Sequence, residues 1–235
     1  MRQQAWSWNS KAVMRGGIER ARTALGLAKI RGGDVADVIV NVVENKECCL
    51  VFCAHQKVSD ELGAQLHRAG IKSLIVDGRT PPAERARIES VFQAGSLQVF
   101  IGGINSAGES MTLHRADTVI FVELDWVPAA LTQAEDRIHR KGQIKNCHVI
   151  HLIARLDGLN LDHDMISILG SKLARIGEVL GENTDNIVHE KGSIQAVVFE
   201  KLLSKSRVKL LEVEKPPLQV KVELKTAETV KNPFS

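Results

Sequence analysis

Gln133-Ala-Glu-Asp-Arg-Ile-His-Arg-Lys-Gly-Gln143 is the most informative stretch of this 235-residue chain. If the stretch is a helix, residues four and seven apart share a face. Gln133, Arg137 and Arg140 then point the same way. A second face is apolar and can pack against a core; it holds Leu131, Ala134 and Ile138. Arginines held side by side repel each other, and a guanidinium suits phosphate, so the stretch predicts an anion site.

A solvated helix is the alternative interpretation of the same residues. Asp136 lies four residues before Arg140, and Glu135 lies two residues before Arg137. Local pairing of this kind neutralises many charged helices, and charge runs on helices are common. The neighbouring segments are needed to decide between the two interpretations.

Composition favours an ordinary globular protein, with 44% hydrophobic and 25% charged residues and a net charge of +3. Residues 1–31 form a basic arm, which either contacts nucleic acid or is simply solvated. No apolar run reaches the length of a membrane span. The four cysteines lack zinc spacing and are expected to be buried thiols in a reducing compartment, so we expect an intracellular protein, cytoplasmic or nuclear.

Apolar strand-like runs alternate with amphipathic helices through the middle of the chain. Such alternation predicts βαβ units and a parallel sheet flanked by helices, an α/β fold. The expected strands are residues 48–54, 73–76, 97–101, 118–122 and 148–153, with an exposed edge strand at 220–225. The expected helices are residues 18–30, one capped by Asp34, 58–69, 81–94, 128–140 and 161–180.

Polar clusters follow four of these strands, and the carboxyl ends of parallel strands share one rim where ligands bind. The clusters are His55-Gln-Lys57, Asp77-Gly-Arg-Thr80, residues 102–110 and Asp125-Trp126. Thr80 and Ser106 are expected to cap helices whose N-termini could face a phosphate. Trp126 is expected to pack its loop rather than stack on a base.

Six blocks in this order closely resemble the C-terminal helicase lobe of Swi/Snf-type DNA-dependent ATPases, a superfamily 2 group, and look most like its annealing-helicase, fork-remodelling branch. The blocks are Val51-Phe-Cys-Ala-His55, Asp77-Gly-Arg-Thr-Pro-Pro-Ala-Glu-Arg85, Asn105-Ser-Ala-Gly108, Ala116-Asp-Thr-Val-Ile120, Asp125-Trp-Val-Pro128 and residues 133–143. The resemblance covers residues 20–182 and implies a single RecA-like lobe with a C-terminal brace helix. It leaves a basic arm at 1–19 and an appendage at 183–235.

The resemblance implies a role for the arginines. Arg137 and Arg140 would be arginine fingers that reach the γ-phosphate of ATP held by another lobe. Gln133 and Asp136 would orient them and couple them to the loop at 102–110. In that loop Gly108 and Glu109 would face the nucleotide, and Glu109 departs from the small or apolar residues usual there.

The resemblance also implies contacts with the backbone of double-stranded or branched DNA, which position a protein without reading sequence. The residues at matching positions are His55, Arg79, Thr80, Asn105 and Ser106.

The chain lacks a Gly-x-x-x-x-Gly-Lys-Ser/Thr loop and the acidic pair that holds Mg²⁺. We therefore expect a second lobe of an ATP-dependent DNA translocase or remodeller that is inactive alone. Its first RecA-like lobe, which would hold ATP and Mg²⁺, would lie in another chain or a missing segment. The alternative is a non-catalytic DNA- or protein-binding module that kept the fold.

Overall fold

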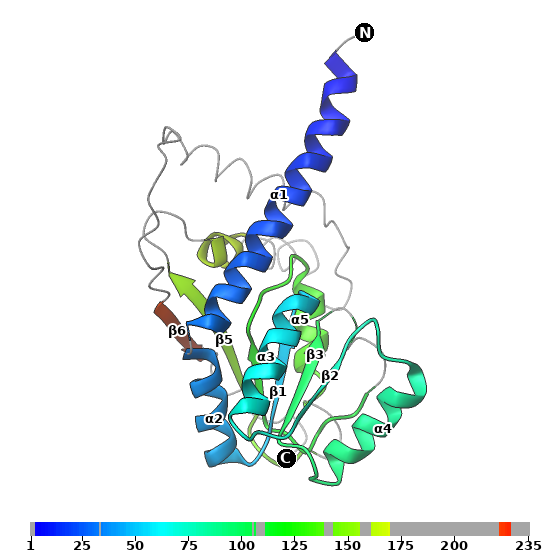
Figure 1. Ribbon diagram of the computed structural model, residues 1–235, viewed down its shortest axis with the longest axis vertical. Coiled ribbons are helices and arrows are strands. Elements are labelled where there is room, and N and C mark those ends of the chain that lie inside the picture. The colour runs from blue at the N-terminus through cyan, green and yellow to red at the C-terminus, as the bar shows by residue number, and fades with distance from the viewer. Residues whose placement is uncertain are drawn as a thin grey trace, which may run out of the picture.

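The computed structural model describes residues 3–32, 34–104, 106, 111–138, 143–155, 161–169 and 221–226. Its elements follow one another in the alternating order that the sequence predicts (Figure 1). The helices are α1 (Gln3–Arg31), α2 (Asp34–Lys46), α3 (Gln56–Arg68), α4 (Pro82–Gln93) and α5 (Pro128–Glu135). The strands are β1 (Cys49–Cys53), β2 (Ser73–Val76), β3 (Val99–Gly103), β4 (Thr118–Phe121), β5 (His148–Arg155) and β6 (Lys221–Thr226).

The strands form one sheet in the order β2-β3-β1-β4-β5-β6. β1 to β5 pair in parallel, and β6 pairs antiparallel with β5 at the edge. This confirms the predicted parallel sheet flanked by helices. The strand that the sequence places at 220–225 is also present, as β6.

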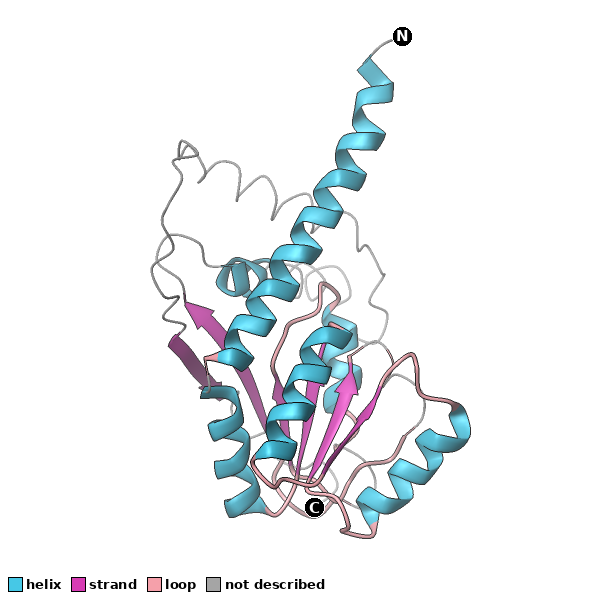
Figure 2. Ribbon diagram, in the orientation of Figure 1, coloured by secondary structure: helices cyan, strands magenta, loops and turns pink. Residues whose placement is uncertain are grey.

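Successive residues of the central strands enter different cores, which explains their unbroken apolar sequence. In β1, Phe52 packs with the α4 and α5 side chains, whereas Val51 packs with those of α2 and α3. Figure 2 shows α3 on one side of the strands and α5 on the other. The four cysteines are free and buried, as expected.

Gly102 of β3 is a position where no other residue fits. It pairs with Phe52 of β1, and a Cβ placed there would lie 2.5 Å from the Phe52 ring. The missing side chain lets the Phe52 ring lie across β3 and stack on Phe121, with ring centroids 5.6 Å apart.

Helix α1 is much longer than the helix predicted at 18–30 and runs without a break through residue 19. Its first half extends away from the sheet, and its second half lies against α2 and α3 (Figure 1). The predicted boundary between a basic arm and the lobe therefore falls inside one helix. A further helical segment covers residues 161–169, and the rest of the expected helix to residue 180 lies outside the described residues.

Candidate functional site

The polar clusters predicted to share a rim do follow the carboxyl ends of neighbouring parallel strands. β1 ends at Cys53, β2 at Val76, β3 at Gly103 and β4 at Phe121. Ser106 lies close to the turn after β2, because a Cβ on Gly78 would be 3.9 Å from its hydroxyl oxygen. Asn105, Gly108, Glu109 and Arg140 lie outside the described residues.

His55 lies between two carboxylates at the start of α3. Its ring Nδ1 is 2.7 Å from Glu123 Oε1, and its Nε2 is 3.0 Å from Glu19 Oε2. Burial by itself would lower the pKa of His55, but the hydrogen bonds to Glu123 and Glu19 outweigh burial and raise it to about 9. The hydrogen bond from His55 is the main reason that the pKa of Glu19 falls to about 2. His55 is therefore an imidazolium that joins α1 to the rim.

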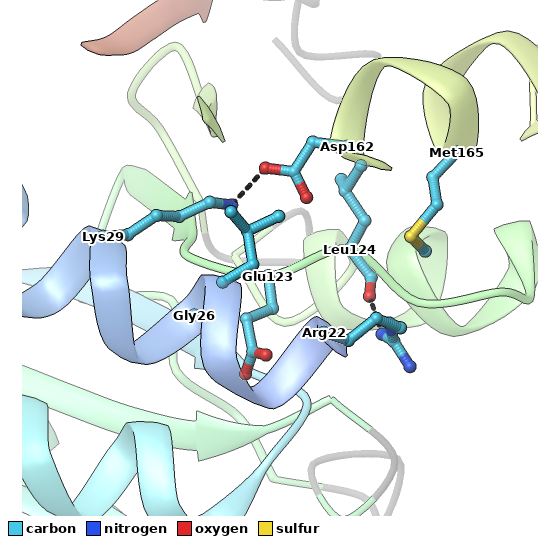
Figure 3. A pocket seen from close by; sticks show the side chains of 8 residues that line it. Arg22, Gly26, Lys29, Glu123, Leu124, Asp162 and Met165 are labelled. Atoms are coloured by element: carbon cyan, nitrogen blue, oxygen red, sulfur yellow. Dashed lines mark hydrogen bonds and ion pairs between the residues drawn. The ribbon is translucent and has the colours of Figure 1, made fainter. Parts of the chain in front are cut away.

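Two cationic side chains of α1, Lys29 and Arg22, are also buried in the protein. Lys29 Nζ donates to the carbonyls of Val122 and Leu152 at 2.8 and 2.7 Å and pairs with Asp162 at 2.5 Å. Arg22 donates to the Leu124 carbonyl, and its guanidinium lies over the Trp126 ring, 4.9 Å from the centroid. Figure 3 shows Lys29 pointing from α1 toward Asp162, and Arg22 pointing toward the Leu124 carbonyl.

We call the set Glu19, Arg22, Lys29, His55, Glu123 and Asp162 the α1 clamp. Arg22 and Lys29 were counted in a solvated or nucleic-acid-binding basic arm, and that interpretation is wrong for these two because both are buried. The sequence did contain a signal that α1 packs against the lobe. Its residues at the contact are spaced so that they share one helical face: Glu19, Arg22, Gly26 and Lys29. The burial of Trp126 confirms its packing role.

The turn after β2 is built around Asp77. Its carboxylate accepts from the Arg79 backbone N–H at 2.8 Å and from the Arg79 side chain at 2.6 Å. Arg79 also holds Asp60 of α3 through two hydrogen bonds of 3.0 and 2.6 Å. Arg79, a predicted phosphate contact, thus already grips two acids, and these hydrogen bonds lower the pKa of Asp77 and raise that of Arg79.

Thr80 does not cap α4, contrary to the sequence prediction. Its hydroxyl instead accepts from the Asp77 backbone N–H at 3.1 Å, and Pro81 occupies the N-cap position without a side-chain cap. Thr80 therefore does not supply the expected helix N-terminus for phosphate. The backbone N–H of Ser106 closes a turn onto the Gly103 carbonyl, and the residues that a Ser106 cap would start, 107–110, lie outside the described residues.

Arg85 is a site residue that the sequence motifs contain but do not mark as functional. From α4 its guanidinium donates to the carbonyls of Asp77 and Thr80 in one loop and of Ser106 in the next. It therefore ties together the two loops that carry most of the predicted DNA contacts. The sequence shows no spacing that would reveal these bonds, because main-chain carbonyls occur at every position and their meeting depends on the tertiary fold.

The arginine stretch differs from the predicted continuous helix. α5 ends at Glu135, and the next residues form tighter turns in which Arg137 and Ile138 donate to residues three positions earlier. Gln133 and Asp136 are exposed, whereas Arg137 is 4% exposed. The prediction that Gln133 and Arg137 share a helical face is therefore wrong, although the apolar face is buried as expected.

The arginine stretch packs against residues 111–116. Arg137 Nη1 donates to the Met111 carbonyl at 3.3 Å, and the Leu113 N–H donates to the Arg137 carbonyl at 3.3 Å. Gln143, which closes the quoted stretch, is buried and donates to the carbonyls of His114 and Ala116 at 3.0 and 2.8 Å. These contacts join the stretch to the segment that follows the loop at 102–110.

Among the described residues, no group of three or more His, Cys, Asp or Glu side chains could hold a metal ion. None of the helices described is both long and apolar enough to cross a bilayer. The described rim loops present backbone amides, hydroxyls and paired charges. Such a surface suits contacts with a polyanion.

A RecA-like α/β lobe with this rim is the class of domain that the fold and site define. Residues 34–142 match the family described as helicase conserved C-terminal domain. The chain is 36% identical over 130 residues to the "SWI/SNF-related matrix-associated actin-dependent regulator of chromatin subfamily A-like protein 1" of Xenopus tropicalis, a match that covers 54% of this chain and 14% of that protein. It is 31% identical over 189 residues to the "DNA annealing helicase and endonuclease ZRANB3" of Bos taurus, covering 80% of this chain and 17% of the relative.

Solved structures agree on the fold. The crystal structure of the C-terminal part of the Fun30 ATPase domain superposes with a TM-score of 0.53 at 23% identity, over 68% of this chain and 50% of that one. Residues 34–142 are thus a C-terminal helicase lobe of the Swi/Snf type, in superfamily 2. The match spans only 14% and 17% of the two relatives' lengths, far less than a whole protein.

Proposed function

We propose that this chain is the second lobe of an ATP-dependent double-stranded DNA translocase or remodeller. One observation carries the proposal: a Swi/Snf-type helicase lobe keeps its arginine stretch, with Arg137 bound to the segment that follows the loop at 102–110, yet its sequence has no phosphate-cradling loop. A nucleotide-binding lobe from another chain, or from a segment outside this sequence, would complete the site. Residues 20–182 would form the lobe and 183–235 an appendage to it.

In this proposal Arg140 is the arginine finger. Bound ATP, with Mg²⁺ held by the other lobe, would supply the phosphoryl group, and a finger contributes on the order of 10³–10⁵ in rate in other NTPases. Gln133, Asp136, Gly108 and Glu109 would lie at the nucleotide side. Arg137 would act as a second finger only after leaving the Met111 carbonyl.

DNA would lie along the rim, with its backbone near the loops after β1, β2 and β3. His55, Arg79, Thr80, Asn105 and Ser106 are the proposed contacts. His55 and Arg79 each hold two carboxylates in the described conformation, so a phosphate would have to replace an acid at either of them. This competition predicts modest affinity for DNA in the isolated chain.

A fusion tests the assignment. A Swi/Snf-type first lobe carrying its own phosphate loop is joined through a flexible linker in front of residue 1, which raises its effective concentration at this lobe. The chain alone should hydrolyse no ATP, and the fusion should show hydrolysis stimulated by duplex DNA. Arg140→Ala should remove that hydrolysis, while Arg87→Ala, which changes an exposed arginine of α4, should retain it. Full hydrolysis in the Arg140→Ala fusion would overturn the finger assignment.

The second candidate function is a non-catalytic DNA- or protein-binding module. The inward position of Arg137 favours it. A guanidinium that is buried and bonded to the Met111 carbonyl has a packing role that requires no ATP. This function predicts binding of duplex DNA by the chain alone, with steep salt dependence and no need for nucleotide. It also predicts that the fusion hydrolyses no ATP with or without DNA.

A further inference from the structure

Helix α4 presents two different faces. Ile88 and Phe92 are four residues apart and buried in the core. Arg85, Glu89 and Gln93 are also spaced by four and therefore lie on one face of the helix. Each of these three polar side chains binds main-chain atoms of a segment outside α4. We call them the α4 ladder.

The first rung of the ladder holds the rim. Arg85 donates through Nε to the Thr80 carbonyl at 2.9 Å and through Nη2 to the Asp77 carbonyl at 3.0 Å. Its Nη1 donates to the Ser106 carbonyl at 3.1 Å. Hydrogen bonds from a charged donor are stronger than neutral ones, so Arg85 fixes the relative positions of these two loops.

The second and third rungs hold the segment at 111–115. Glu89 Oε1 accepts from the Thr112 N–H at 2.8 Å. Gln93 Oε1 accepts from the Arg115 N–H at 3.1 Å, and its Nε2 is 3.1 Å from the His114 ring. The same segment binds the arginine stretch through Arg137 and Gln143. One helix thus touches the rim at its start and the support of the arginine stretch along its length.

We propose that the α4 ladder couples DNA contact at the rim to the position of the arginine stretch. A rigid helix hydrogen-bonded to main chain at each rung passes a displacement from the loops at 77–80 and 106 to residues 111–116. The inference rests on the proposed function, because it assigns DNA to the rim. It adds Arg85, Glu89 and Gln93 as positioning residues, which touch neither ATP nor the reacting atoms.

Hydrogen exchange on the full chain, with and without a short blunt-ended duplex DNA, tests the ladder. In the wild type, DNA should slow amide exchange in the rim loop at 77–80 and also in residues 111–116. The remote change should be about twofold to thirtyfold, the range that coupling networks produce. Glu89→Ala should keep the rim protection and lose the remote one.

Two variants separate coupling from folding. Glu89→Gln retains an oxygen that can accept from the Thr112 N–H and should keep the remote response. Arg87→Ala removes an exposed ion pair on the same helix and should behave as the wild type. If Glu89→Ala loses its fold, seen as uniformly fast exchange, Gln93→Ala takes its place with the same expected loss.

The outcomes distinguish the inference from the function beneath it. Protection at the rim with unchanged exchange at 111–116 in the wild type overturns the coupling alone. A remote response that survives both Glu89→Ala and Gln93→Ala also overturns it. Absence of DNA binding overturns the proposed DNA contacts and the coupling together.

Discussion

Two groups of paired charges flank the rim, and they differ mainly in burial. In the α1 clamp, Lys29 and Asp162 are 2.5 Å apart with side chains 1% and 7% exposed. At the other group, Arg79 and Asp60 are 2.6 Å apart with side chains 50% and 49% exposed. We call the latter group, Arg79 with Asp60 and Asp77, the Arg79 fork. Similar distances therefore describe two interactions with different consequences.

The difference follows from desolvation. A buried charge that loses its partner stays out of water, so breaking a buried pair is costly even where forming it gained little. An exposed pair can exchange its partner for water or another ion at small cost. The α1 clamp should therefore hold the fold together, and the Arg79 fork should be able to open for a ligand. Each prediction below breaks or sharpens this contrast.

Lys29→Met should have the largest effect. It leaves Asp162 and the Val122 and Leu152 carbonyls without their buried cation. Loss of one partner of a buried pair costs about 3–5 kcal/mol of unfolding free energy. Urea titration followed by circular dichroism measures it.

Arg31→Met is the matched control for Lys29→Met. Arg31 lies on the same helix, two residues further on, and its side chain is 65% exposed with a loose 4.0 Å contact to Glu61. Its substitution should shift the urea midpoint little. Equal shifts in the two variants would contradict the claim that the clamp fastens α1.

The pH dependence of stability should report His55 and Glu19. A His55 pKa raised from 6.5 to about 9 stabilises the fold fully below pH 6.5 and progressively less as the pH rises through 9. A Glu19 pKa lowered from 4.5 to about 2 stabilises it fully above pH 4.5, with loss as the pH falls through 2. Between pH 6.5 and 9 the unfolding free energy should fall by no more than about 1.4 kcal/mol per pH unit.

His55→Gln should flatten the alkaline slope, because the amide does not titrate. Thermal or urea unfolding at several pH values between 6.5 and 9 measures the difference between this variant and the wild type. His67→Gln, which changes an exposed histidine near the end of the same helix, should retain the slope. A His55→Gln curve parallel to the wild type would show that the clamp holds a neutral histidine.

Gly26→Ala tests how closely α1 docks. A Cβ at this position would lie 2.7 Å from Glu123 Oε1 and 2.8 Å from Val58 Cγ2. Glu123 cannot easily move because His55 and the Ala54 N–H hold it. Overpacking of this kind costs about 1–3 kcal/mol.

Gly17→Ala in the same helix should have the opposite sign. A Cβ there meets nothing within 4 Å, and alanine favours a helix over glycine by about 0.5–1 kcal/mol. Melting temperatures of the two variants provide the comparison. If both substitutions raise the melting temperature, α1 is less tightly packed against the lobe than its buried charges imply.

The sequence predicted the sheet well because each central strand is covered on both faces. An unbroken apolar run such as residues 48–54 has few alternatives in a chain of this length. The end of α5 could not be predicted in the same way. Ile138 is buried like Leu131 and Ala134, so the apolar spacing continues past Glu135, where the backbone has already changed to tighter turns.

The candidate site was harder to predict than the fold. The motifs located the rim, but they did not show that His55 and Arg79 already hold acids from distant segments. Glu123 left a usable signal, since it is a carboxylate directly after the apolar run at 118–122. Arg85 and Gln143 left none, because the main-chain carbonyls to which they donate are brought to them only by the tertiary fold.

Asp60→Asn should change stability least and is informative about ligand binding. Asp60 is the exposed acid of the Arg79 fork, while Asp77 is buried and also fixes the turn after β2. Because Asp60 is the partner that can give way, its neutralisation should free one side of the guanidinium for a phosphate. The melting temperature should stay within error of the wild type, since exposed pairs contribute little.

Binding of duplex DNA by the full Asp60→Asn chain should become tighter and more salt-dependent. One additional phosphate contact steepens the plot of log affinity against log salt concentration by about 0.9. Glu61→Gln is the matched control, because it removes the same charge from the next position of α3 and faces Arg31 and Arg68 instead. Equal gains in both variants would indicate a general charge effect. No gain in either would mean that Arg79 stays bound to Asp77 and that the fork, like the α1 clamp, serves the fold and not the ligand.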